Sequence, residues 1–95
     1  MPTFDEVLAY ASRHEGETFR TYGRGETFCV DAGEDGLYFT PINTGGLRSE
    51  LKRPKGEKVL ARYDKTHSFQ PKDYQDLTYN ASYFLALVAL IETGR

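Results

Sequence analysis

Apolar residues near the start of the chain repeat with the spacing of one helical face. They fall at i, i+3, i+4 and i+7, at Phe4, Val7, Leu8 and Ala11. Thr3 and Glu6 fit a capping box, in which the hydroxyl and the carboxylate satisfy free backbone amides at a helix start. Gly16 is typical of the residue that follows a helix. The pattern predicts an amphipathic helix that ends near residue 15.

The spacing then changes to the alternation of β-strands. Three segments have it, at 17–22, 27–32 and 37–41. Between the second and the third lies GEDG at 33–36, a four-residue hairpin loop whose glycines can adopt positive φ. These features predict consecutive antiparallel strands.

A turn at 43–46 leads toward a fourth strand at 47–51. If this strand forms, Leu47 and Leu51 face inward, whereas Arg48 and Glu50 share the solvent face. Because Pro54 and Gly56 follow, we expect the strands to end there, as a meander of three or four antiparallel strands.

Two further helices are predicted, at 57–65 and at 80–94, joined by a connection with one turn opened by Pro71. The last helix is apolar all round from Tyr83 to Ile91, so it must bury more than one face. Either it lies under the sheet, with the other helices on its flanks, or its outer face meets a second copy of the chain. In a homodimer the expected interface residues are Tyr83, Leu87, Leu90 and Ile91.

The predicted fold class is therefore α+β in a single domain, residues 1–95. One cysteine, Cys29, excludes an intrachain disulfide. The N-terminal residues lack the basic and apolar regions of a signal peptide, and the longest apolar run, 83–91, is shorter than the roughly 20 residues that span a bilayer. We expect a cytoplasmic protein that contacts no membrane.

Charge is distributed unevenly, although the net charge is only −2. Residues 1–35 carry eight acidic and three basic residues, whereas residues 36–72 carry eight basic and three acidic ones. Such a chain can present a basic face to a polyanion. Alternatively, the two parts neutralise one another across the folded surface.

The basic residues concentrate in segment 44–58, which also contains a glycine pair that exposes backbone amides. The candidate contacts for nucleic acid or another polyanion are Gly45, Gly46, Arg48, Lys52, Arg53, Lys55 and Lys58. Aromatic rings near such a patch can stack on bases, and the candidates are Tyr22, Tyr38 and Tyr63.

Other site chemistries are not supported by the sequence. The glycines of YGRGETF (22–28) lack the third glycine of a dinucleotide fingerprint, and DAGEDG (31–36) lacks the later glutamate of a calcium loop. Cys29, His14 and His67 do not have the paired spacing of a zinc site. We predict no metal, no cofactor and no catalytic residue.

The words RTYGRGETF, GLYFTP, TGGLR and NASYFLAL, spread over residues 20–88, resemble a pattern in small uncharacterised α+β proteins. These include proteins of mobile gene cassettes and modules attached to restriction-type enzymes. The resemblance implies a stand-alone cytoplasmic module of a bacterial or phage accessory type and transfers no catalytic residue.

Two functions follow from these observations. The first is a non-enzymatic binding module that contacts nucleic acid through segment 44–58. The second is a homodimeric protein-interaction or inhibitor protein with an acidic protein partner. Cations gathered on one face favour the first, and cations paired with the acidic residues favour the second.

Overall fold

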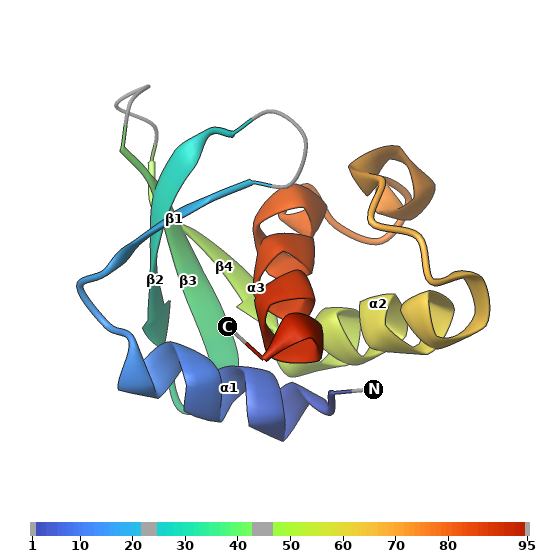
Figure 1. Cartoon of the computed structure of the whole chain (residues 1–95), viewed down its shortest axis with the longest axis horizontal. Coiled ribbons are helices and arrows are strands. Elements are labelled where there is room, and N and C mark those ends of the chain that lie inside the picture. Colours follow the sequence, from blue (N-terminus) through green and yellow to red (C-terminus); the bar gives the residue numbers. More distant parts are fainter. Residues whose placement is uncertain (1, 22–24, 43–46, 95) are drawn as a thin grey trace.

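The computed structural model describes residues 2–21, 25–42 and 47–94 and has an α+β fold, as expected (Figure 1). An N-terminal helix precedes four strands, and two helices with a short 3₁₀ helix between them follow. The elements are α1 (Phe4–Arg13), β1 (Thr18–Arg20), β2 (Thr27–Ala32), β3 (Gly36–Pro41), β4 (Ser49–Lys52), α2 (Arg53–Thr66), η1 (Pro71–Tyr74) and α3 (Ala81–Thr93).

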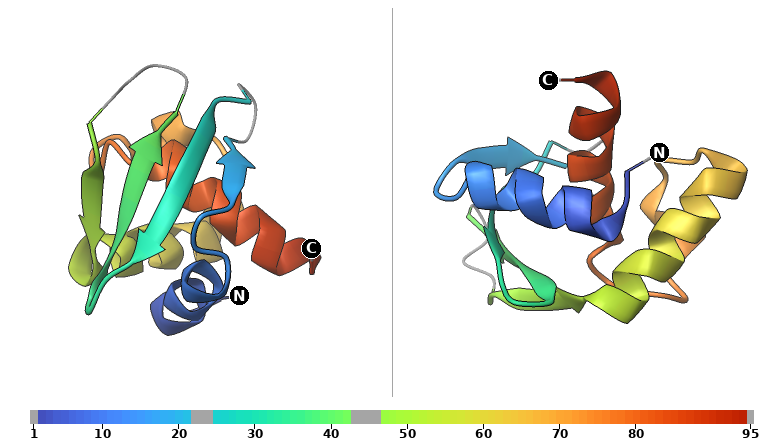
Figure 2. Two further views of the ribbon diagram at one scale, coloured as in Figure 1. Left: turned by 90° about the vertical axis from the view of Figure 1, so that its left-hand side faces the viewer. Right: turned by 90° about the horizontal axis from the view of Figure 1, so that it is seen from below.

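The four strands form one antiparallel meander in the order β1-β2-β3-β4, which confirms the expected topology. Phe28 pairs with Phe19, and Leu37 pairs with Leu51, so one face of the sheet is continuously apolar. The helices lie on that side, and among residues 2–21, 25–42 and 47–94 no helix covers the other side, which we call the open face (Figure 2). Its polar side chains are therefore accessible to a partner.

Helix α1 begins with the capping box that the sequence predicts. The Thr3 hydroxyl accepts from the Glu6 amide at 3.2 Å, and the Glu6 carboxylate accepts from the Thr3 amide at 3.4 Å. Tyr10 joins the predicted apolar residues on the buried side of the helix. This stripe packs α1 against β2 and β3.

Two predicted boundaries are wrong at the junction of β4 and α2. The strand begins at Ser49, which pairs with Phe39, so Leu47 precedes the sheet and is 90% exposed. Helix α2 begins at Arg53, and both Pro54 and Gly56 lie inside it. Proline is tolerated there because the first amides of a helix have no intrahelical acceptor.

Helix α3 lies against the apolar face of the sheet and contacts α1, η1 and β1, in line with the first of its two predicted placements; a contact of its outer face with a second copy stays a prediction. Phe84, Leu85, Leu87 and Val88 are fully buried. Leu87 is therefore a core residue, and its prediction as an interface residue is wrong because the chain's own fold covers it. Tyr83 is half-buried, with its ring 4.9 Å from that of Phe28.

Leu90 and Ile91, at the C-terminal end of α3, remain half-buried at the surface. Over the described ranges, no helix combines the length and apolar character needed to cross a membrane.

Candidate nucleic-acid interface

The structure divides the predicted basic segment among three places, and the first is the open face of the sheet. Arg48 lies there with its guanidinium carbon 4.2 Å from the centroid of the Tyr38 ring. Its Nη2 atom is 3.8 Å from a carboxylate oxygen of Asp31. The Glu50 carboxylate, opposite Tyr38 on β4, raises the pKa of Tyr38. Arg48 thus covers one face of the ring that we expected to stack on a base.

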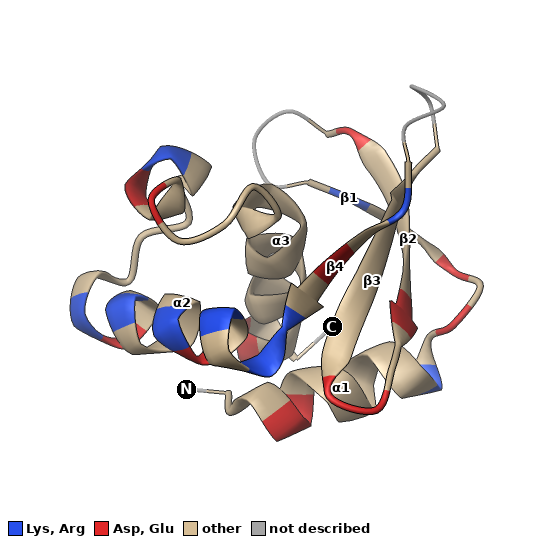
Figure 3. Cartoon of the chain, turned by 180° about the vertical axis from the view of Figure 1, so that it is seen from behind, with Lys and Arg blue, Asp and Glu red and all other residues tan. Residues whose placement is uncertain are grey.

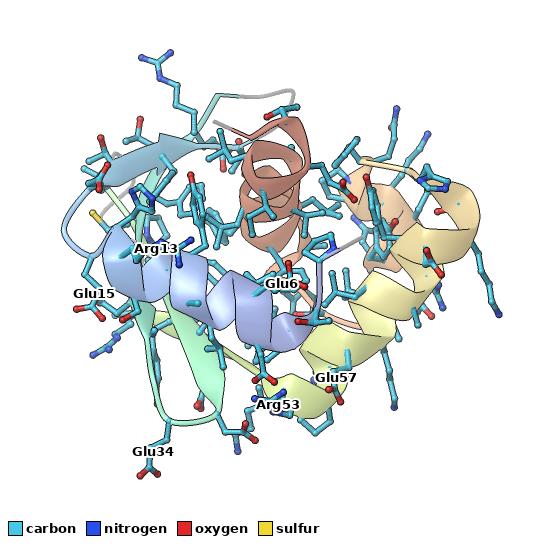
Figure 4. The ribbon with its side chains drawn as sticks, turned by 60° about the horizontal axis from the view of Figure 1, so that its bottom comes forward. Glu6, Arg13, Glu15, Glu34, Arg53 and Glu57 are labelled. Carbon is cyan, nitrogen blue, oxygen red and sulfur yellow. The ribbon has the colours of Figure 1, made fainter. Side chains whose placement is uncertain are left out.

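The second place is the junction of α1, α2 and the β2–β3 loop, where Arg53 lies (Figure 4). Its Nη2 atom donates to Asp5 at 2.6 Å, its Nε atom donates to Asp35, and Nη1 is 3.6 Å from Glu57. Its guanidinium also lies over the Phe4 ring at 5.0 Å. These partners raise the pKa of Arg53. Because these carboxylates already engage its guanidinium, Arg53 holds α1, α2 and the β2–β3 loop together, and its contact with a phosphate stays a prediction.

The third place is α2, where exposed lysines follow the helical repeat. Lys55, Lys58 and Lys65 lie within an arc of about 80°, since each residue turns an α-helix by about 100°. We call these three residues the lysine flank. All three are exposed, and none forms an ion pair with a described residue. Lys52, directly before the helix, is exposed and equally without an ion pair among described residues.

Arg62 falls on the same side of α2 but is held by the segment that follows η1. Its two terminal nitrogens donate to the Asp76 carboxylate at 2.6 and 3.0 Å, and Nη1 also donates to the Asp73 carbonyl at 2.9 Å. The bidentate pair lowers the pKa of Asp76 and raises that of Arg62. Arg62 thus fastens this segment to α2 and leaves the lysines as the free charges.

Acidic residues occupy a different side of the helix. Glu57 and Asp64 lie at least 80° from the lysine flank at about 100° per residue. Figure 3 shows basic residues recurring along α2, whereas acidic residues colour the β2–β3 loop and the start of α1. These acidic residues lie beside the start of α2, where Asp5 and Asp35 are paired with Arg53, and the lysine flank extends away from them along the helix.

Three of the remaining candidates lie outside the described residues, namely Tyr22, Gly45 and Gly46. Tyr63 was expected to stack on bases, and this is wrong because it is 4% exposed in the apolar stripe of α2. Its ring centroid lies 5.1 Å from that of Phe69. Burial raises its pKa.

Lys65 is the residue of this surface that sequence reasoning left out of the site. Its signal was present, because Lys55, Lys58, Arg62 and Lys65 follow one another at steps of three, four and three residues. The sequence prediction began this helix at residue 57, so Lys55 was assigned to a connecting segment and the repeat was not recognised; in the structure the helix begins at Arg53.

Two other kinds of site were considered, a cleft in the surface and a metal site built from His, Cys, Asp or Glu side chains. The cleft has a volume of about 750 Å³ and lies beside the first turn of α3, between residues 68–72 and the end of β1. Its lining residues include Thr21, Phe69, Lys72 and Ser82. Within the part of the chain that the structure describes, no three His, Cys, Asp or Glu residues are placed to hold a metal ion. Cys29 is half-exposed on the open face.

Comparisons with protein-family models, with curated proteins and with solved structures gave no match.

Proposed function

We propose that the protein is a small non-enzymatic binding module that contacts the nucleic-acid backbone through the lysine flank of α2, with Lys52 beside it. The observation that carries this proposal is the contrast among the cations. The three arginines of the predicted region and of α2 have acidic partners, whereas the exposed lysines have none among the described residues. A phosphate can therefore approach these lysines without breaking an ion pair of the fold.

The dimensions of the flank suit a polyanion. Lys55 and Lys65 are ten residues apart, which is about 15 Å along the helix. One strand of duplex DNA carries a phosphate about every 3.4 Å of its axis, so the flank spans roughly four phosphates. Lysine ammonium groups on long side chains can follow such a backbone, but they read no base pattern. Binding is therefore expected to be insensitive to sequence.

A net charge of −2 does not oppose this contact, because the carboxylates that touch α2 from other elements are already paired, Asp5 and Asp35 with Arg53 and Asp76 with Arg62. Glu15 follows α1, and Glu34 and Asp35 occupy the β2–β3 loop (Figure 4). A polyanion is attracted most to basic side chains that have no acidic partner of their own. The lysine flank is thus expected to make the first contact.

The test is the binding of a short labelled DNA duplex, measured by fluorescence anisotropy over a series of salt concentrations. Wild-type affinity should fall steeply as salt increases. The double variant Lys55→Gln/Lys58→Gln should bind more weakly, and its plot of log affinity against log salt should be shallower by roughly two. Both lysines are exposed, so the variant should keep its circular dichroism spectrum and its melting temperature.

The matched control is Arg20→Gln/Arg48→Gln, which removes the same charge from the open face of the sheet. It should reduce affinity far less than the lysine variant. Equal losses in the two variants would mean that net charge alone matters, and a larger loss in the control would place the contact on the sheet. Absence of wild-type binding at low salt would refute nucleic acid as the partner. If polyglutamate then binds with the same dependence on Lys55 and Lys58, the partner is an acidic protein.

A further inference from the structure

A second surface, away from the lysine flank, lies where α1 runs beside the C-terminal end of α3. A groove of about 470 Å³ separates the two helices there. Ala9, Tyr10, Leu90 and Ile91 provide its apolar lining, and Glu6 and Arg13 line it from α1. Leu90 and Ile91 are half-buried, so the chain's own fold leaves this end of the apolar helix α3 incompletely covered.

We propose that a second copy of this chain occupies the groove, with the α1 helices of the two copies packed antiparallel across a two-fold axis. Each α1 would then lie over Leu90 and Ile91 of the partner subunit. A two-fold interface uses the same patch on both copies, so the patch must be complementary to itself. The charges at the groove meet this requirement.

Glu6 and Arg13 are seven residues apart, two turns of the helix or about 10 Å, and lie on one side of α1 (Figure 4). The middle of this interval is at Ala9 and Tyr10. An antiparallel pair of helices that crosses there sets each Glu6 opposite Arg13 of the partner subunit. One patch therefore supplies two opposite-charge pairs to the dimer.

Both charged side chains have capacity for a second contact. Glu6 uses Oε1 for Thr3 in the capping box, and its Oε2 atom has no partner among the described residues. Arg13 is exposed and forms no ion pair with any residue that the structure describes.

Ala9 lies between them on the exposed side of the helix. A small residue at the crossing point lets two helix axes come within about 8–10 Å, at which distance the apolar side chains on both sides touch. Since α1 is only about 15 Å long, the interface is small, and the dimer is expected to be concentration-dependent.

The test is the solution mass, measured by sedimentation over a range of protein concentrations. Wild type should shift from monomer to dimer as concentration rises. Arg13→Glu and Glu6→Arg should each remain monomeric, because each single change sets like charges opposite one another at both ends of the crossing. An equimolar mixture of the two variants should form a heterodimer, because the all-basic patch of one then meets the all-acidic patch of the other. This recovery would not follow from a change that merely damaged the fold.

Ala9→Gln provides a second variant that leaves the capping box and all charges intact. It should abolish the dimer without changing the melting temperature of the monomer, because Ala9 is exposed. A wild-type protein that stays monomeric at every concentration would overturn the proposal. Dimers of undiminished strength in Ala9→Gln or in Arg13→Glu would also overturn it.

Discussion

Gly56 lies near the start of α2, directly against Phe4 of α1, and its replacement by alanine tests how closely these two helices pack. On helix propensity alone, Gly56→Ala should stabilise the protein by about 0.5–1 kcal/mol. The structure predicts the opposite sign. A Cβ atom added at Gly56 would lie 2.1 Å from Cε1 and 2.5 Å from Cδ1 of Phe4.

The size of the effect follows from the position of the Phe4 ring. Carbon atoms in contact are about 3.5–4.0 Å apart, so the ring or the helix must move by roughly 1.5 Å. Phe4 is 2% exposed and is stacked on Phe84 at 6.0 Å, so it cannot turn out into solvent. Overpacking of this kind costs about 1–3 kcal/mol. After the gain in propensity of about 0.5–1 kcal/mol, Gly56→Ala should destabilise the protein by about 0–2.5 kcal/mol, with a central value of about 1 kcal/mol.

Thermal and urea unfolding followed by circular dichroism would measure this difference. A loss of 1 kcal/mol lowers the melting temperature of a domain of this size by about 4–8 °C. Ala61→Gly is the matched control, because Ala61 is an exposed residue of the same helix and reports propensity alone. In a Phe4→Leu background, Gly56→Ala should cost less, since the smaller side chain makes room. If Gly56→Ala stabilises the protein by as much as Ala61→Gly destabilises it, the close contact between α1 and α2 is refuted.

Three further substitutions test the core, an ion pair and the end of the sheet. Leu87→Ala should cost about 2–5 kcal/mol in unfolding experiments without changing the oligomeric mass, because Leu87 is fully buried in the monomer. Asp76→Asn should be less stable than wild type near neutral pH, because it removes the carboxylate that Arg62 binds. Since Arg62 lowers the pKa of Asp76 from 3.8, the difference in stability should vanish as pH falls through that lowered pKa. Urea unfolding over a pH series would measure it. Asn80→Ala removes the donor to the Glu50 carbonyl at 3.3 Å and the acceptor of the Ser49 hydroxyl at 2.6 Å, and it should cost about 1–3 kcal/mol in unfolding experiments. An unchanged midpoint would mean that these two contacts do not support β4.

Helix α1 and the meander could be predicted because several local signals agreed at each of them. At α1 the capping residues, the apolar stripe and a following glycine all indicate the same helix. In the strands, alternation set which side chains face the core, and Phe28 and Val30 are buried as it requires. These rules act over a few residues, so they need no knowledge of the tertiary structure.

The start of α2 could not be predicted in this way. Pro54 and Gly56 are usual helix breakers, but here the first lies where no amide hydrogen bond is lost, and the second makes room for Phe4. The partners of Arg53 were equally hidden, because Asp5 is 48 residues away and Asp35 is 18 away. Contacts at such separations depend on the packing of α1, α2 and the β2–β3 loop, which no local pattern encodes.

The candidate site was predicted from charge alone, and charge alone did not distinguish its arginines from its lysines. Arg53 and Arg62 each bond two acceptors with a planar guanidinium, and the Arg48 guanidinium lies over the Tyr38 ring. A lysine ammonium offers neither a fork nor a flat surface, so the fold has less use for it as an anchor. The residue type therefore sorts the basic segment into anchors and free charges. Consider a variant in which Arg53 is replaced and Lys55 and Lys58 are kept. If this variant no longer binds DNA, we infer that the junction between α1 and α2 has been lost, and not a phosphate contact. Comparison of the melting temperatures of the two kinds of variant would separate these causes.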